Sequence, residues 1–176
     1  LLLKKEEWEK LIKDTATIKG KYILYYSVNC RRYSWEIAKK LSELTHMPVI
    51  NLVEHPKVFM AGFKNCYDKG PLEFLNIIKN AEYVVTNSFH GVAFSINFKK
   101  KFAPVFQMID GKIQLEERKY DLLKRVGLES LIITDMNEEV LKKISTIDYS
   151  AVEKKLDMIR KESLSYIDGV VNDLNN

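Results

Sequence analysis

The residues with the clearest chemical potential form one short polar run, Thr86-Asn87-Ser88-Phe89-His90-Gly91. The run follows a β-prone segment at 83–85 and leads into apolar residues at helical i, i+3, i+4, i+7 spacing, namely Phe89, Val92, Ala93 and Ile96. It therefore predicts a turn from a strand into a helix. Thr, Asn and Ser are favoured N-cap types, and the free N–H groups of a helix N-terminus attract anions. We expect an anion-binding turn with His90 and Gly91 in the first helical turn.

Composition sets the class of protein in which this turn is found. The chain has 176 residues, of which 46% are hydrophobic and 30% are charged, so it can bury the core of one globular domain. Its formal net charge is +4, and residues of both signs are interspersed along the chain. Nucleic-acid-binding proteins usually concentrate basic residues on one face, so we expect no nucleic-acid partner.

Cysteine and histidine usage argues against a metal site. Cys30 and Cys66 lie far apart without a CxxC partner, and the three histidines have no ligand spacing around them. Two free thiols in a reducing cytoplasm fit this pattern, although one disulfide stays open as an alternative. We see neither a signal peptide nor an apolar run approaching about eighteen residues. The chain begins with leucine rather than methionine, so we expect it to be part of a longer protein.

The elements before the turn predict a parallel sheet. Residues 22–26 form a nearly continuous apolar run, as in a strand buried on both faces, and 34–45 and 47–53 predict a helix and a second strand. This βαβ unit has a right-handed crossover and therefore parallel strands. Further helices are expected at 4–14 and 71–80. The intervening segment 54–70 predicts an irregular loop with room for one short strand.

Beyond the turn the alternation of strands and helices continues. Strands are expected at 101–107 and 131–134, and helices at 115–126 and 137–144, with Gly127 as a helix-terminating residue and Asp110-Gly111 as a turn. A long final helix is expected at about 150–174, opened by a capping box of Ser150 and Glu153. Its apolar residues recur at three- and four-residue steps. This spacing favours a helix laid against the domain, with a dimer seam as the alternative.

Together these elements predict a single α/β domain over 1–176, a Rossmann-like doubly wound fold with a mainly parallel sheet and helices on both faces. Ligands of such sheets bind at the C-terminal ends of the strands, where residues 86–91 would lie. Neither GxGxxG nor GxxxxGK[ST] occurs, which excludes an NAD fingerprint or a Walker loop as the basis of function.

One long stretch also resembles a known family. Residues 74–95, which read FLNIIKNAEYVVTNSFHGVAFS, resemble the signature of the polysaccharide pyruvyl transferase family, and segments 1–8, 21–26 and 118–128 echo its pattern. The resemblance implies that the chain is the C-terminal half of a GT-B-like two-domain architecture with the active site between the halves. It also implies a missing N-terminal half, which supplies a further arginine.

The resemblance implies a reaction in which phosphoenolpyruvate donates its enolpyruvyl carbons to two hydroxyls of a sugar. The product is a pyruvate ketal and phosphate is released; no cofactor is required beyond this donor substrate. His90 matches the motif histidine of the family, as phosphate ligand or as proton shuttle, and histidine changes protonation near neutral pH. We therefore identify His90 as the expected catalytic residue, with both roles open.

The resemblance also supplies substrate-binding residues. Arg118 corresponds to a family arginine downstream of the motif, and its guanidinium suits a carboxylate or phosphate. The family has Asn-Ser before that arginine where this chain has Glu116-Glu117. Asn87 and Ser88 would donate neutral hydrogen bonds, and Gly91 would let the ligand approach closely.

The expected acceptor is a saccharide of a cell-surface polysaccharide or of its lipid-linked precursor. A lipid-linked acceptor would bring a cytoplasmic enzyme to the inner face of the membrane as a peripheral protein. The isolated half is expected to be inactive. Two other functions stay open: a nucleotide-sugar-dependent glycosyltransferase of GT-B type, and a non-catalytic half-domain that binds an anion or a partner.

Overall fold

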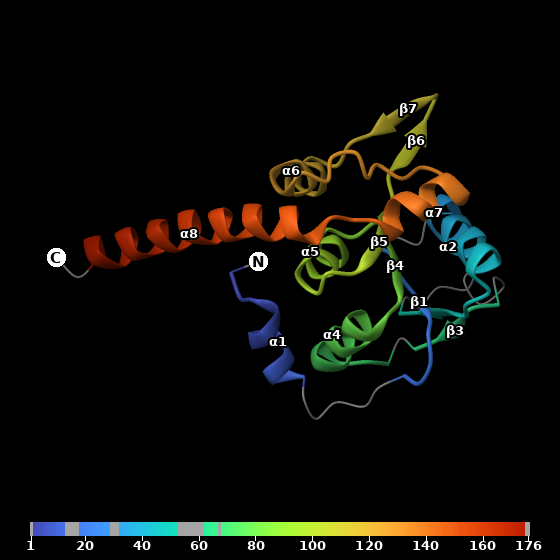
Figure 1. The fold of residues 1–176 in the computed structure, drawn as a ribbon, viewed down its shortest axis with the longest axis horizontal. Helices are drawn as coiled ribbons and strands as arrows, with labels where there is room; N and C mark the ends of the chain where they lie inside the picture. The colour runs from blue at the N-terminus through green and yellow to red at the C-terminus, as the bar shows by residue number, and fades with distance from the viewer. Residues whose placement is uncertain (1, 13–17, 29–31, 53–61, 67, 175–176) are drawn as a thin grey trace.

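A five-stranded sheet forms the centre of the protein (Figure 1). The computed structural model describes residues 2–12, 18–28, 32–52, 62–66 and 68–174. In these residues the strand order is β3-β2-β1-β4-β5, and each neighbouring pair is parallel. The strands are β1 Ile23–Tyr26, β2 Val49–Asn51, β3 Lys64–Asn65, β4 Tyr83–Thr86 and β5 Lys101–Pro104.

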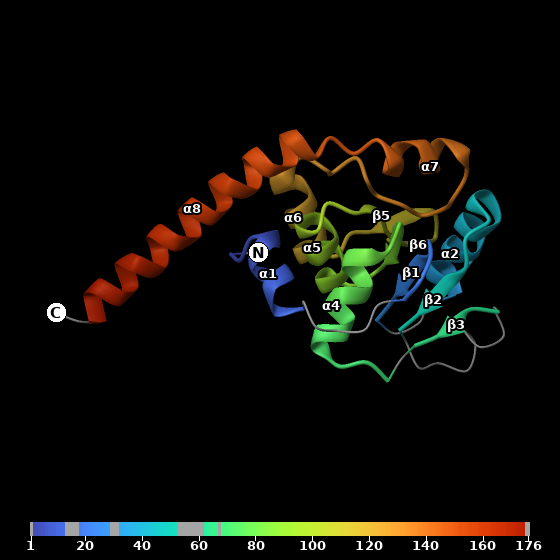
Figure 2. The same ribbon diagram turned by 60° about the horizontal axis from the view of Figure 1, so that its bottom comes forward.

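Helices cover both faces of this sheet. Figures 1 and 2 show α2 and α7 on one side of the strands and α4 and α5 on the other. The described helices are α1 Lys5–Leu11, α2 Arg32–Thr45, α4 Pro71–Asn80, α5 Phe89–Asn97, α6 Glu117–Val126, α7 Glu138–Ser145 and α8 Tyr149–Leu174. The Rossmann-like, doubly wound α/β prediction is confirmed.

The core lies along the two central strands. Ile23, Leu24, Val84 and Val85 are each 0% exposed, as expected for strands with helices on both faces. Each such side chain contributes about 1.5–3 kcal/mol relative to an exposed position. The continuous apolar run in the sequence therefore identified the centre of the sheet correctly.

The predicted loop before α4 contains β3, which is the short strand for which the sequence left room. Residues 53–61 and 67 of that region lie outside the described residues. Cys66 follows β3 as a half-buried free thiol. Cys30 also lies outside the described residues, so the prediction of two free thiols is confirmed for Cys66 alone.

The segment after β5 differs from the prediction of one strand over 101–107. β5 ends at Pro104, Val105 forms an isolated parallel bridge with Ile133, and the chain then enters an antiparallel hairpin. The hairpin consists of β6 Gln107–Ile109 and β7 Lys112–Gln114. It closes through the predicted Asp110-Gly111 turn, where both residues have positive φ, 49° and 72°, as two-residue hairpin turns require. The strand expected at 131–134 is reduced to the single bridge.

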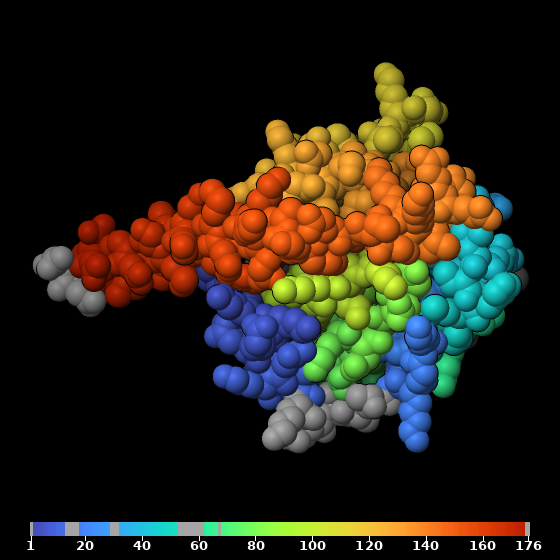
Figure 3. Space-filling view, viewed as in Figure 1, coloured from blue at the N-terminus to red at the C-terminus, as the bar shows by residue number. Residues whose placement is uncertain are grey.

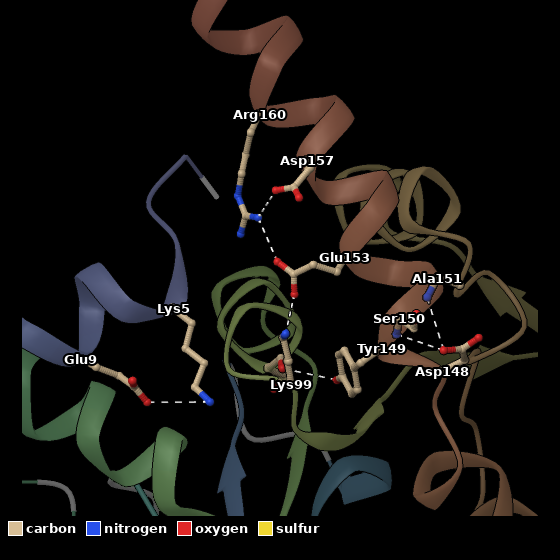
Figure 4. Close-up of polar contacts among 11 residues, drawn as sticks. Lys5, Glu9, Lys99, Asp148, Tyr149, Ser150, Ala151, Glu153, Asp157 and Arg160 are labelled. Atoms are coloured by element: carbon tan, nitrogen blue, oxygen red, sulfur yellow. Dashed lines mark hydrogen bonds and ion pairs between the residues drawn. The ribbon is translucent and has the colours of Figure 1, made fainter.

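Three helix ends agree with the predictions made from the sequence, and one differs from them. Gly127 ends α6 with φ 77°, and Asn137 caps α7 by accepting the Val140 N–H. Pro71 opens α4 as predicted. The capping box of Ser150 and Glu153 is wrong, because α8 begins at Tyr149 and Asp148 accepts the N–H groups of residues 150 and 151 instead (Figure 4).

Helix α8 packs on the domain only through its first half. Val152, Leu156 and Arg160 are buried, and Glu153 links Lys99 to Arg160 through two ion pairs (Figure 4). The later turns stand clear of the domain (Figure 3) and expose five large aliphatic residues, Leu164, Ile167, Val170, Val171 and Leu174. The prediction that the whole helix lies against the domain is wrong for this half, and the dimer seam stays a prediction.

In the described part of the chain, α8 included, no helix is long and apolar enough to cross a membrane.

Candidate functional site

The chain reverses its direction of travel across the sheet between β1 and β4. From β1 it moves outward to β2 and β3, and from β4 it moves outward to β5. In doubly wound sheets the crevice at the C-terminal ends of two such strands is where ligands bind. Val28, just after β1, and residues 86–91, at and beyond the end of β4, lie at this reversal. The predicted anion-binding turn is therefore at the switch point of the sheet.

The turn itself keeps the first amides of α5 free of side-chain caps. Ser88 occupies the N-cap position, but its hydroxyl makes no capping hydrogen bond. The Ser88 N–H instead donates to Oγ1 of Thr86 over 3.0 Å. Because uncapped N–H groups at the positive end of a helix favour anions, this local geometry supports anion binding. The expectation that Ser88 caps through its side chain is wrong; its contact with a substrate stays a prediction.

Gly91 is required here by packing. A Cβ atom on Gly91 would lie 2.2 Å from Oγ1 and 2.8 Å from Cβ of Thr86, which is 0% exposed. Only a residue without a side chain lets the first turn of α5 approach the end of β4 this closely. The structure thus gives a packing reason for glycine, and the approach of a ligand to Gly91 stays a prediction.

Asn87 joins the ends of the two central strands. Its Oδ1 accepts the Val28 N–H over 2.7 Å, and its Nδ2 donates to the Val28 carbonyl over 2.9 Å. The side chain thereby fixes the two sides of the switch point against each other. The substrate-binding role of Asn87 stays a prediction, and any ligand contact would be added to these two hydrogen bonds.

His90 and Arg118 are brought to the same aromatic ring. The His90 ring centroid lies 5.8 Å from that of Phe89, and Arg118 Cζ lies 5.4 Å from the same Phe89 centroid. Both polar side chains are exposed. Glu116 pairs with Lys119, and Arg118 makes no ion pair with any acid in the described residues. The two residues, twenty-eight positions apart in sequence, are therefore neighbours of one ring and available to a ligand.

Lys119 lies on the inner side of α6, beneath this surface. It is 1% exposed, and its ammonium donates to the carbonyls of Asn87 (3.1 Å) and Val105 (2.8 Å) and to Oε1 of Glu116 (2.8 Å). The ammonium also lies 4.2 Å from the centroid of the Phe106 ring. Burial lowers the pKa of Lys119, and the hydrogen bond with the Glu116 carboxylate opposes that change.

A shallow pocket of about 300 Å³ opens beside Arg118. Its lining combines apolar and charged side chains from α5, α6 and α8: Phe89, Arg118, Asp121, Leu122, Arg125 and Ile159. Arg125 pairs with Glu162 over 3.4 Å, so the guanidinium open to an anion is that of Arg118, which has no ion pair among the described residues. Such a surface suits a polar, anionic ligand. Within the described ranges no three His, Cys, Asp or Glu side chains cluster as metal ligands would.

Comparison with known families agrees with this geometry. The sequence model described as polysaccharide pyruvyl transferase matches residues 3–105, which is more than half of the 176 residues. The chain belongs to the polysaccharide pyruvyl transferase family. The matched segment includes the five strands and the turn with His90, whereas Arg118 and Lys119 lie beyond it.

Other comparisons add little to the family assignment. No curated protein matches the chain. Among solved structures, the chain is similar to UDP-GlcNAc 2-epimerase from Methanocaldococcus jannaschii, with 14% identity and a TM-score of 0.47. The similarity covers 88% of this chain and 49% of the epimerase chain, so this chain spans about half the length of that protein.

One residue of this candidate site was missed at the level of sequence. Lys119 precedes Leu122, Leu123 and Val126 at i, i+3, i+4 and i+7, which is the spacing of the buried side of α6. A lysine in an otherwise apolar series is the signal that predicts a buried ammonium.

Proposed function

We propose that this chain is one half of a phosphoenolpyruvate-dependent pyruvyltransferase that forms a pyruvate ketal on a saccharide. The observation that carries the proposal is the convergence of the family histidine, His90, and of Arg118 on Phe89 at the switch point of the sheet. Family membership supports pyruvyl transfer. An exposed imidazole, an exposed guanidinium and uncapped helix amides are the groups that a donor with a phosphate and a carboxylate needs.

The proposed reaction begins with a proton transferred to the methylene carbon of phosphoenolpyruvate. The carbon that bears the phosphate becomes oxocarbenium-like, and a first sugar hydroxyl attacks it and loses its proton. Phosphate then leaves with the electron pair of its C–O bond, and a second hydroxyl closes the ketal. One hydroxyl proton balances the proton gained by the methyl group, and the other leaves with phosphate.

The residues of this chain would hold the donor and move the proton. Arg118 would bind the carboxylate or the phosphate through paired N–H groups. The first amides of α5 would bind the other anionic group. His90 would give the proton to the methylene carbon or hold the phosphate as imidazolium, and both roles require its exposed ring at the mouth of the turn.

We further propose that an N-terminal half completes the active site. The resemblance to the family implies a second Rossmann-like half that faces the C-terminal ends of the strands and carries another arginine. The acceptor would be a saccharide of a cell-surface polysaccharide or its lipid-linked precursor, and the enzyme would then work at the cytoplasmic face of the membrane.

A thermal-shift titration of the full-length enzyme tests the donor. A ligand that binds only the folded state at about one hundred times its Kd stabilises that state by about 2.7 kcal/mol. Phosphoenolpyruvate should raise the melting temperature, whereas nucleotide sugars should leave it unchanged. A rise with nucleotide sugars alone would favour the glycosyltransferase alternative. Isotopically labelled phosphoenolpyruvate should also appear in an acid-labile ketal on the saccharide.

The catalytic role of His90 is tested by His90→Asn, with His46→Asn as the matched control. Both histidines are exposed, and His46 follows α2 with φ 56°, a conformation that asparagine tolerates. Positioned acid–base groups contribute about 10²- to 10⁴-fold. We expect His90→Asn to lower kcat/KM by at least about 100-fold with an unchanged melting temperature. The control should keep full activity, and normal turnover by His90→Asn would remove His90 from the mechanism.

A further inference from the structure

The buried ammonium of Lys119 is satisfied by three acceptors at the candidate site. A lysine ammonium has three N–H donors, and Lys119 has one acceptor for each: two backbone carbonyls and the Glu116 carboxylate. Its side chain is 0% exposed. Removing such a cation from water is strongly unfavourable before its hydrogen bonds are formed. An apolar side chain would fill the same space without that cost.

The positions of the two carbonyls show what the ammonium holds together. The Asn87 carbonyl belongs to the turn between β4 and α5, and the Val105 carbonyl follows the end of β5. Asn87 is also bonded to Val28 at the end of β1 through its amide. Lys119 therefore fastens the start of α6 to a junction of three adjacent strand ends, at the switch point where the proposed donor binds.

Arg118 is the preceding residue of α6 and points outward over Phe89, while Phe89 and His90 are the first two residues of α5. Their relative position depends on how the first turn of α6 sits against the turn before α5. Among the described residues, one direct hydrogen bond joins these two turns, and it runs from the ammonium of Lys119 to the Asn87 carbonyl. Its loss would free Arg118 to move relative to His90.

We propose that Lys119 is a positioning residue for the proposed pyruvyl transfer: its ammonium holds the start of α6 against the His90 turn, so that Arg118 and His90 bind the same phosphoenolpyruvate. The inference rests on the proposed function. Lys119 has no exposed surface with which to contact the donor, so it acts through Arg118 and through the backbone of Asn87. In this proposal Lys119 positions and Arg118 binds the donor.

The matched control for this role is Lys100. Like Lys119, it is a partly desolvated lysine whose pKa is lowered by burial and whose ammonium donates to a backbone carbonyl, that of Lys79 over 2.8 Å. It immediately precedes β5, at the opposite end of that strand from the site. Lys119→Met and Lys100→Met each remove one ammonium and keep an unbranched side chain that is one heavy atom shorter.

In the full-length enzyme we expect Lys119→Met to raise KM for phosphoenolpyruvate by about ten- to hundredfold, since a displacement of about 1 Å in a binding group can cost that much. The kcat at saturating donor should fall less. Lys119→Arg, which keeps the charge and the donors, should recover part of the affinity. Lys100→Met should lower the melting temperature with KM unchanged.

Coupling to Arg118 separates positioning from general stability. If Lys119 acts through Arg118, Lys119→Met should have little further effect on KM in an Arg118→Ala background. Full additivity, or a wild-type KM in Lys119→Met, would overturn the inference while leaving the proposed function intact. Absence of phosphoenolpyruvate-dependent phosphate release in the wild-type enzyme would overturn both. If Lys119→Met does not fold, Lys119→Gln provides the same comparison, with an intermediate rise in KM expected.

Discussion

The close approach between α5 and β4 makes Gly91→Ala the sharpest test of how the His90 turn is built. A methyl group on Gly91 would lie 2.2 Å from Thr86 Oγ1 and 2.8 Å from Thr86 Cβ, where contacts between such atoms are normally about 3.5–4.0 Å. Thr86 is β-branched and fully buried, and Oγ1 already accepts the Ser88 N–H. Rotation of its side chain would bring another substituent into the overlap, so the helix must shift.

The destabilisation by Gly91→Ala can be bounded from the usual effects of core overpacking and of helix propensity. Overpacking a core by one methyl group lowers the free energy of unfolding by up to about 3 kcal/mol. Replacing glycine by alanine in a helix raises it by about 1 kcal/mol. The net destabilisation is therefore about 2 kcal/mol. For a domain of this size each kcal/mol changes the melting temperature by about 2–4 °C, so Gly91→Ala should lower it by about 4–8 °C.

Gly169→Ala is the control, because it is the same substitution in a helix and, apart from its chain neighbours and the helix's own nearby backbone, no atom lies within 4 Å of the new methyl group. It should leave the melting temperature unchanged or slightly raised, as measured by circular dichroism or calorimetry. In a Thr86→Ala background the cost of Gly91→Ala should shrink, since Oγ1 and Cγ2 are gone. Equal responses of the two glycine variants would refute the packing explanation for Gly91.

Three further predictions concern other parts of the molecule. Asn87→Ala removes both bonds to Val28 and should destabilise the domain by about 1–3 kcal/mol in chemical unfolding; Asn137→Ala, which removes an exposed helix cap, should cost about 1 kcal/mol or less. A hydrogen bond from Lys101 holds the pKa of Glu82 below its ordinary value of 4.5, so the carboxylate contributes stability above that pH and loses it as the pH falls through the lowered pKa. Because the pair is partly exposed, Glu82→Gln should reduce the loss of unfolding free energy at acid pH by less than about 1 kcal/mol. Melting temperatures measured across acid pH check this, and an unchanged dependence on pH would contradict the pairing. Deleting residues 165–174 should change the melting temperature of this 176-residue chain by less than about 2 °C, since that part of α8 is exposed; a larger fall would mean that these turns are covered in solution, as in the dimer seam.

Local patterns were enough to predict the doubly wound sheet and the position of the turn. The switch from an apolar strand to helical spacing across residues 86–91 is a property of neighbouring residues, and so is the termination of α6 at Gly127. The same reasoning failed for α8. A periodic apolar face shows that a helix has apolar side chains to bury, but it does not show how far along the helix the domain extends. It also failed at 101–107, where Pro104 ends one strand and a hairpin follows.

The composition of the site depends on contacts between residues far apart in the chain. The sequence identified His90 and Arg118 as separate candidates, and the packing of α6 beside α5 brought both to Phe89. The bonds of Asn87 to Val28 and of Lys119 to the strand ends span fifty-nine, thirty-two and fourteen positions. No periodicity encodes such pairs, because they form only when the parallel strands align their C-terminal ends at one edge of the sheet.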